Sequence, residues 1–307
     1  MDNRTEVREF LVSRRGNVTP EQAGIVGGTD RRVPGLRRSE VALLAGVSVE
    51  YYTRLERGNL AGVSDSVLEA IAEALQLDEA ERGHLFDLAR AASGGSVVRR
   101  RTRGSRSTTL RPGLQAALDA ITAAPAFVRN GRLDLLGTNL LGRAFHDPTF
   151  AMGDPVPNLA RFCFLSPAAQ DFYPDWKMSA GVTVAILHTE AGRDPHDKDL
   201  HDLVGELSTR SDVFRSLWAA HNVRRHGTGT KFFHHPVVGD LHVSYEGLEV
   251  TEEPGLQFMI YTTEPGSADA ERVALLGSWA ASQPWAAEYA SDASPLRAAP
   301  SPVDELR

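Results

Sequence analysis

Residues 31–59 read RRVPGLRRSEVALLAGVSVEYYTRLERGN, and within this stretch two short helical patterns flank a tight turn. Ala42 and Ala45 are small residues three positions apart, so they lie on one face of the first helix. Gly46 follows at the point where the backbone needs a positive φ to leave that helix. Small residues at this place allow two helices to cross closely at a steep angle. The stretch therefore predicts a pair of helices joined by a short turn.

The second helix of this pair has the pattern of a DNA-reading helix. Ser48 is placed to cap its first turn, and Tyr52 and Leu55 repeat three residues apart as an inward face. This arrangement is a helix-turn-helix, in which the second helix enters the major groove of double-stranded DNA. With Tyr52 and Leu55 inward, the residues that face outward near the start of the helix are Val49, Glu50, Thr53 and Arg54. We expect these four to contact base edges.

Each of the four has a chemical partner in the major groove. Arg54 matches guanine O6 and N7, Glu50 matches a cytosine amino group, and Val49 or Thr53 matches a thymine methyl. Each good pair contributes about 1–3 kcal/mol of discrimination. The groups placed for phosphates are Arg37, Arg38, the Ser48 hydroxyl and Arg57. Phosphate contacts set register without reading sequence, so Arg38→Ala should weaken binding to all sequences alike. The alternative reading of the stretch is a solvated basic face on a helical bundle.

Charge divides the chain into two parts. Residues 1–111 hold 18 basic and 15 acidic residues, a balance of +3, whereas the remainder holds 15 and 25, a balance of −10. The segment SGGSVVRRRTRGSRSTT, from residue 93 to 109, is rich in Gly, Ser and Arg and has almost no residue to pack. It is typical of a flexible basic linker. We therefore expect a DNA-binding domain at residues 1–92, a linker at 93–111 and a second domain at 112–284.

The first domain has only helical patterns, whereas the second alternates strands and helices. Five helices are predicted in residues 1–92, and Asp78 with Glu81 forms a capping box at the last of them. In the second domain, AFVRNGRLDLLGTN at 126–139 predicts a hairpin that turns at Asn130-Gly131. Helices follow, and then three strands between residues 229 and 264. The order predicts a five-stranded antiparallel sheet with helices on one face. Residues 285–307 are polar and proline-rich, which indicates a disordered tail.

The sequence gives no support for a membrane protein, a disulfide-linked protein, a metal-binding protein or an enzyme. Apolar runs stay below the roughly 18 residues of a membrane helix, and the charged N-terminus lacks a signal peptide's apolar stretch, so we expect a cytoplasmic, nucleoid-associated protein. Cys163 stands alone, which excludes an internal disulfide. Histidine pairs five apart diverge on a helix, so we expect no metal and no cofactor. The chain contains no Gly-x-Ser-x-Gly elbow, phosphate loop or HExxH motif, so we expect no enzymatic activity.

The chain resembles the MmyB-like transcription regulators of actinobacteria over nearly residues 4–282. The resemblance lies in RRVPGLRRSEVALLAGVSVEYYTRLERG and SVLEAIAEALQLDEAERGHLFDLA, and it continues beyond the linker in GRLDLLGTN, PDW, GRDPHDKDLHDLVGELSTRSDVFRSLWAAHNV and HHPVVGDLHVSYEGLEV. It implies an all-α helix-turn-helix domain followed by an α+β PAS-like ligand-binding domain. It also implies that Arg14 pairs with Glu56. Thr138 stands where the family usually has an aromatic residue, so we expect a wider or more polar pocket there.

The family resemblance also implies a small apolar effector, fatty-acid-like or otherwise lipid-like. A pocket between sheet and helices would be lined by Phe145, Phe162, Phe164, Trp176, Ile186, Trp218, Phe258 and Ile260. Three functions are compatible with these features. The first is an effector-sensing transcription regulator that binds operator DNA as a homodimer, the second a constitutive regulator whose second domain only dimerises, and the third an enzyme fused to a DNA-binding domain. The residues favour the first.

Overall fold

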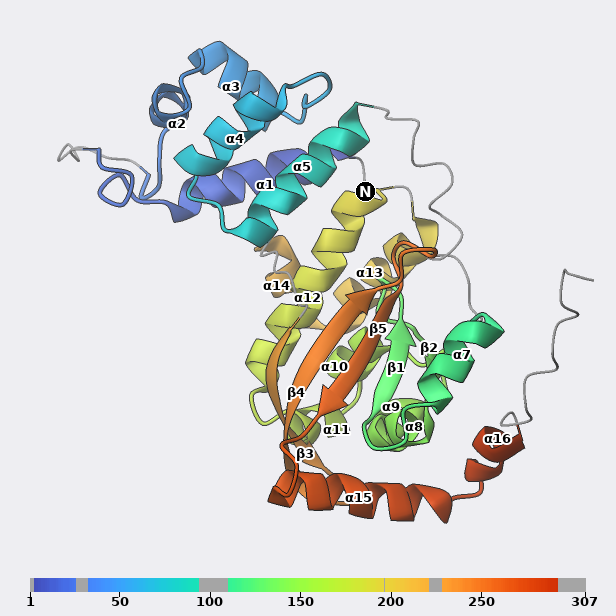
Figure 1. Ribbon diagram of the computed structural model, residues 1–307. Coiled ribbons are helices and arrows are strands. Elements are labelled where there is room, and N and C mark those ends of the chain that lie inside the picture. The colour runs from blue at the N-terminus through green and yellow to red at the C-terminus, as the bar shows by residue number, and fades with distance from the viewer. Residues whose placement is uncertain (1–2, 26–32, 94–109, 196, 221–227, 292–307) are drawn as a thin grey trace, which may run out of the picture.

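The computed structural model describes residues 3–25, 33–93, 110–195, 197–220 and 228–291. A helical N-terminal domain is followed by a second domain built on a sheet (Figure 1). This confirms the predicted order of an all-α domain and an α+β domain. The expected linker lies almost wholly outside the described residues. Within the described residues, no helix is long and apolar enough to cross a membrane.

The five helices predicted for the N-terminal domain are present. Their bounds are α1 Asn3–Asn17, α2 Arg38–Leu44, α3 Val49–Glu56, α4 Asp65–Ala74 and α5 Glu79–Ala92. The core that holds them includes Phe10 of α1, Val41 of α2, Tyr52 of α3 and Leu85 of α5, all fully buried. Each helix therefore contributes one apolar face to a common centre.

The turn between α2 and α3 has the predicted geometry. Gly46 has a φ of +64°, a conformation that other residues rarely adopt. Ser48 begins α3, and its hydroxyl oxygen accepts a hydrogen bond from the Tyr51 backbone N–H at 3.0 Å. Tyr52 and Leu55 are fully buried, as their spacing predicts. The outward face of α3 is therefore defined by the burial of its inward face.

The second domain contains one five-stranded antiparallel sheet, as predicted. The strands are β1 Ala126–Arg129, β2 Leu135–Thr138, β3 Thr228–His235, β4 Gly239–Glu249 and β5 Gln257–Thr262. Their order across the sheet is β2-β1-β5-β4-β3, so β1 pairs with β5 and joins the two ends of the domain's sequence. This long-range pairing makes the domain one folding unit.

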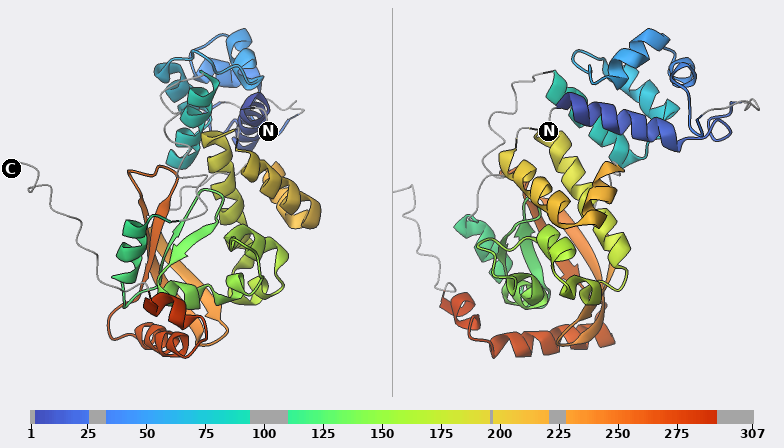
Figure 2. Two further views of the ribbon diagram at one scale, coloured as in Figure 1. Left: turned by 90° about the vertical axis from the view of Figure 1, so that its right-hand side faces the viewer. Right: turned by 180° about the vertical axis from the view of Figure 1, so that it is seen from behind.

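Helices cover both faces of the sheet unequally (Figure 2). The single helix α7 lies on one face, and α10 to α12 lie on the other, as the left panel shows. The bounds are α7 Pro112–Asp119, α8 Leu140–Phe145, α9 Asp147–Phe150, α10 Leu159–Leu165, α11 Ala168–Phe172, α12 Trp176–Arg193, α13 Lys198–Arg210, α14 Asp212–Ala219, α15 Ala268–Ala281 and α16 Ala286–Ser291. The short helices α9 and α11 were not predicted. Helix α16 occupies part of the segment for which the sequence indicates disorder, and 292–307 lie outside the described residues.

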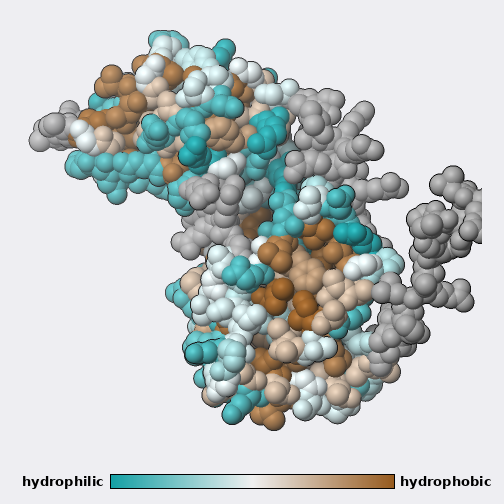
Figure 3. All heavy atoms as spheres, viewed as in Figure 1, coloured by the Kyte–Doolittle hydropathy of each residue, from teal (hydrophilic) through white to brown (hydrophobic). Residues whose placement is uncertain are grey.

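The sheet separates two apolar clusters because strand side chains alternate between faces. Met259 and Tyr261 of β5 point toward the helical layer, where they join Phe127 and Phe145. Residues 258 and 260 point the other way, to the face that α7 partly covers. Figure 3 shows apolar residues gathered over the sheet beside this helix.

The hairpin between β1 and β2 is present, but its predicted two-residue turn is wrong. The loop runs from Asn130 to Asp134, and the positive φ of +70° falls on Leu133 rather than on Gly131. The Asn130 side chain holds the loop, because its Oδ1 accepts from the Asp134 backbone N–H at 3.0 Å and its Nδ2 donates to Asp134 Oδ2 at 2.8 Å. Gly131 serves close packing instead, since a Cβ there would lie 2.1 Å from the Glu190 carboxyl carbon.

Candidate DNA-binding face and ligand-binding domain

The outward face of α3 brings together all four residues predicted to contact bases. They line one concave surface, together with two neighbours: Val49, Glu50, Thr53, Arg54, Arg57 and Asn59. Val49 is 41% exposed although it is apolar, which is consistent with a surface kept for a partner. The Arg54 guanidinium carbon lies 4.7 Å above the centre of the Tyr51 ring. This stacking holds the guanidinium beside the helix, within the same face.

The groups predicted to contact phosphates are all exposed to some degree, but Arg38 also has a structural role. Arg37 and Arg57 are exposed, and Ser48 lies exposed at the start of α3. Arg38 is half-exposed, but its Nε donates to Glu56 Oε1 at 2.7 Å. Replacement of Arg38 would therefore disturb the domain as well as any phosphate contact. Arg57 is the better probe of phosphate binding.

The expected pairing of Arg14 with Glu56 is wrong, because Arg15 holds that position. Arg15 Nε donates to Glu56 Oε2 at 2.6 Å, whereas Arg14 Nη1 donates to Glu81 Oε1 at 2.5 Å. Successive helical residues differ by about 100° in direction, so a one-residue error in alignment exchanges the partners. Burial raises the pKa of Glu56, but the hydrogen bonds from Arg15 and Arg38 outweigh burial and lower that pKa overall. Glu56 thus ties α3 to α1 and to α2, and being buried it is unavailable to DNA.

A pH dependence follows from the lowered pKa of Glu56. A carboxylate whose pKa is depressed in the folded state stabilises the fold above its unfolded-state pKa, and this stabilisation is lost as the pH falls through the folded-state value. The stability difference between wild type and Glu56→Gln should therefore narrow as the pH falls below the ordinary glutamate value of 4.5. Hydrogen exchange of the α3 amides measures the stability of the N-terminal domain alone, in wild type and in the variant. A stability difference for Glu56→Gln that stays constant with pH would contradict the assignment of Glu56 as the partner of Arg15 and Arg38.

Helix α12 of the second domain contacts α5 and, through His188, α1 of the N-terminal domain (Figures 1 and 2). At its C-terminal end, Gly192 lies so close to His84 of α5 that a Cβ would come within 2.4 Å of the imidazole Cε1. Ser13 of α1 donates its hydroxyl hydrogen to the Ala220 carbonyl oxygen at 3.1 Å, beyond the end of α14. The two domains are therefore in direct contact through three helices.

A buried histidine lies at the centre of this contact. His188 Nδ1 lies 3.2 Å from Glu6 Oε1, and the ring stacks on Trp218 at 3.7 Å between centroids. Its Nε2–H donates to the Trp218 carbonyl oxygen at 2.9 Å, since a carbonyl can only accept. A proton must therefore also lie between Nδ1 and the Glu6 carboxyl group. Both side chains are almost fully buried, so this hydrogen bond joins the domains away from water. Sequence patterns did not indicate it, because its partners are 182 residues apart.

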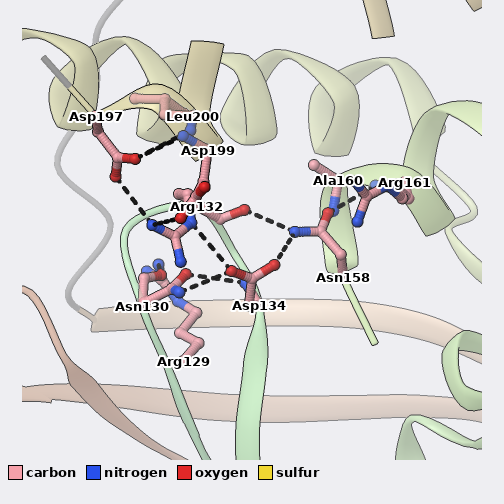
Figure 4. Close-up of polar contacts among 10 residues, drawn as sticks. All are labelled: Arg129, Asn130, Arg132, Asp134, Asn158, Ala160, Arg161, Asp197, Asp199 and Leu200. Atoms are coloured by element: carbon pink, nitrogen blue, oxygen red, sulfur yellow. Dashed lines mark hydrogen bonds and ion pairs between the residues drawn. The ribbon is translucent and has the colours of Figure 1, made fainter. Parts of the chain in front are cut away.

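A second buried network fixes the base of the hairpin loop to the helical layer (Figure 4). Arg132 Nε donates to Asp134 Oδ2 at 3.1 Å, and its Nη1 donates to Asp197 Oδ2 at 3.0 Å. The Arg132 carbonyl oxygen accepts from Asn158 Nδ2 at 2.9 Å, just before α10. Burial alone would lower the pKa of Arg132, but Asp197 and Asp134 raise it above its ordinary value. The guanidinium thus remains charged and joins the hairpin loop to the segment before α13, while the Arg132 backbone adds the contact with Asn158.

Comparison with protein families identifies both domains. Residues 110–276 match the MmyB-like transcription regulator ligand binding domain, which is more than half of the chain. The chain belongs to this family. Residues 12–85 match a helix-turn-helix domain, so this MmyB-like protein is a DNA-binding transcription regulator. A search of curated proteins found no match.

The eight residues expected to line an effector pocket do not form one group in this MmyB-like protein. Alternation along β5 and the division of the helical layer distribute them over three clusters. Phe145, Phe162 and Trp176 belong to the cluster on the inner face of the sheet; Phe164, Ile186 and Trp218 belong to the cluster around α12 to α14; Phe258 and Ile260 lie on the opposite face. Only the first group lies between the sheet and the short helices.

The histidines and Thr138 have local structural partners. His235 is fully buried and lies 3.2 Å from the Ala144 carbonyl oxygen through Nε2, while His234 lies 2.6 Å from Asp240 on the neighbouring strand. Within the described ranges, no three metal-binding side chains cluster. The Thr138 hydroxyl lies 2.8 Å from the Tyr289 hydroxyl of α16. The space expected beside Thr138 is thus reached by a tyrosine from the C-terminal helix.

Proposed function

We propose that this MmyB-like regulator reads a specific operator through the exposed face of α3. The observation that carries the proposal is that Val49, Glu50, Thr53 and Arg54 share one concave surface while Tyr52 is fully buried beneath them. One recognition helix makes few base contacts, so tight specific binding normally requires two half-sites. The protein would therefore act as a homodimer on double-stranded DNA, with its acidic second part repelled by the phosphates.

The second domain is proposed to sense a small effector with an apolar, lipid-like or fatty-acid-like body. What supports this is the aromatic cluster between the sheet and the short helices, including Phe145, Phe162 and Phe233, together with the contact of α12 with α1 and α5. An effector that favours one arrangement of the short helices could alter the position of α12 and hence of the DNA-binding domain. The His188–Glu6 contact is where such a change would be transmitted.

The alternative is a constitutive regulator whose second domain only dimerises. The observation in its favour is the dense packing of the inner cluster, where the Phe145 ring meets Phe233 at 4.9 Å and Tyr261 at 5.1 Å, both edge to face. Such packing leaves little room without movement of side chains. The two functions differ in whether a ligand changes DNA affinity.

The experiment begins with selection of operator sequences from a pool of random duplexes by the full-length chain. An organic extract of the purified protein is then analysed by mass spectrometry and added back while the operator Kd is measured. Allosteric coupling of 1–3 kcal/mol would change this Kd about 5–150-fold. An unchanged Kd with every extracted compound would support the constitutive alternative, and equal affinity for operator and scrambled duplexes would overturn the proposed recognition by α3.

The contact between domains can be weakened without touching α3. Gly192→Ala places a Cβ 2.4 Å from the buried His84 ring, so α12 or α5 must shift. We expect this variant to bind the operator but to lose most of the effector-induced change in Kd. Gly181→Ala is the matched control, because nothing lies within 4 Å of a Cβ at that position of the same helix. A full effector response in Gly192→Ala would show that the signal does not pass through this contact.

A further inference from the structure

The outer face of the sheet, which is turned away from the helical layer, is only partly covered by α7 (Figure 2, left panel). Leu248 of β4 is paired with Phe258 of β5 and points to this side, as does Ile260 two positions further along β5. Leu248 is 55% exposed, and the other two side chains are half-buried. Figure 3 shows apolar residues gathered over these strands beside α7. We call the even-numbered residues of β3, β4 and β5 the open face, because they all point to this side.

The open face carries little charge, although it belongs to the acidic part of the chain. It contains no lysine and no arginine, and both of its carboxylates have neighbours on the same face. The Glu246 side chain accepts from the Thr228 hydroxyl at 2.8 Å, and Asp240 lies 2.6 Å from His234. Residues 112–307, by contrast, hold 25 acidic and 15 basic residues. Depletion of charged residues marks the centre of a protein interface, and two acidic domains repel each other least where charge is sparse.

The middle of the open face is also flat. Thr230, Ser244 and Thr262 lie in one row across the three strands, and all three side chains are short. Beside this row, the Phe232 ring stacks on His242 of the neighbouring strand with 4.3 Å between centroids. A flat surface of short side chains permits a second sheet to approach to about 10 Å, the usual spacing of packed sheets.

The size of the open face approaches what a stable contact requires. Strand β4 has 11 residues, so the face is roughly 35 Å long and, with three strands about 4.8 Å apart, about 14 Å wide. These dimensions give roughly 500 Å², compared with the about 800 Å² per partner that a stable interface buries. The apolar side of α7, with Leu114 and Ile121, continues the surface beyond β5 and β1 and supplies further area.

The position of the open face leaves the DNA-binding domain accessible. The N-terminal domain lies beyond one end of the strands, whereas the open face is turned to the side (Figure 2, left panel). A two-fold axis parallel to the strands would therefore place two N-terminal domains at the same end of a pair of sheets. Two recognition helices at one end are what a duplex with two half-sites requires.

We propose that the open face binds the open face of a second copy of this chain, so that two sheets pack face to face around a two-fold axis. The proposal rests on the proposed operator recognition, because it specifies the surface that joins the two copies. In such a contact the same surface is used by both copies, so Leu248 and Phe258 of each form one apolar centre. The proposal also gives a role to Phe258 and Ile260, which lie on the opposite face of the sheet from Phe145.

The test is the oligomeric state of the full-length chain, measured by sedimentation velocity over a range of concentrations. We expect wild type to be a dimer. Leu248→Glu should raise the dimer Kd at least about a hundredfold, because two-fold symmetry brings two carboxylates together in one apolar contact. Ser244→Arg places a bulky charge in the flat row and should also dissociate the dimer, which covers the case in which Leu248→Glu fails to fold.

A matched control replaces an exposed leucine outside the open face. Leu275 of α15 is 62% exposed, so Leu275→Glu introduces the same charge at a comparable surface position. This variant should dimerise like wild type. A wild type that is monomeric at every concentration, as it would be if a lipid or another protein covered the open face, would overturn the proposal. So would a dimer that both open-face variants leave intact, or one that only Leu275→Glu dissociates.

Binding to DNA separates this proposal from operator recognition. On a duplex with a single half-site, Leu248→Glu should bind like wild type, whereas on the full operator it should lose most of the affinity gained from the second half-site. A dimer that Leu248→Glu dissociates, but that binds operator and scrambled duplexes equally, would support the interface and overturn operator recognition.

Discussion

Arg132→Met should lower the free energy of unfolding of the second domain by about 3–5 kcal/mol, the usual effect of removing one partner of a buried ion pair. Methionine fills a similar volume but leaves Asp197, whose side chain is 3% exposed, and Asp134 without their cation. All four tryptophans lie beyond residue 175, so tryptophan fluorescence during urea unfolding reports on this domain.

Arg215→Met provides the matched control for this prediction. Arg215 Nη2 donates to Asp212 Oδ1 at 2.5 Å, but that carboxylate is 88% exposed. Exposed ion pairs contribute about 0–1 kcal/mol, so this variant should be nearly as stable as wild type. A similar small loss for Arg132→Met would mean that the Arg132 network tolerates an apolar substitute. The assignment of Arg132 as the link between the hairpin loop and the helical layer would then be wrong.

Arg54→Ala should weaken binding to the selected operator by about 1–3 kcal/mol, roughly 5–150-fold in Kd, and should weaken binding to scrambled DNA much less. The reason is that a guanidinium on a base edge discriminates between sequences, whereas one on a phosphate does not. The stacking of Arg54 on Tyr51 keeps its side chain beside the outward face of α3. Anisotropy titrations with operator variants should show that discrimination is lost at one base pair.

Arg57→Ala is the comparison variant, because Arg57 is expected to contact a DNA phosphate and not a base. This exposed residue borders the same concave surface, and its loss should reduce affinity alike for operator and scrambled duplexes and lessen the salt slope by about one. Arg38→Ala is less informative, because Arg38 also pairs with buried Glu56. If Arg54→Ala loses the same affinity for operator and for scrambled duplexes, Arg54 contacts a phosphate and not a base.

Local patterns predicted most of the secondary structure because its causes are local. Gly46 and Ser48 end one helix and begin the next through their own backbone and hydroxyl groups, so the turn was predictable without tertiary information. The hairpin was predictable for the same reason, but its turn was not. In isolation, Asn130-Gly131 favours a two-residue turn. In the folded chain Gly131 packs against Glu190, which is 59 positions away, and the loop is longer.

Of the two candidate sites, local sequence patterns could predict one but not the other. The α3 face could be predicted from the spacing of Tyr52 and Leu55, because one helix has one geometry. The residues expected to line an effector pocket could not be grouped from sequence, because the cluster that a residue joins depends on which face of a strand packs against which helix.

By itself the sequence determined the two-domain order, the helix-turn-helix and the residues on the outward face of its second helix. Each of these depends on contacts within about one helical turn or one hairpin, where backbone geometry restricts the outcome. Tertiary structure alone decided the partner of Glu56 and the buried His188–Glu6 contact between the domains. These two contacts join residues that are 41 and 182 positions apart, so they form only when the whole fold packs and do not follow from local preference.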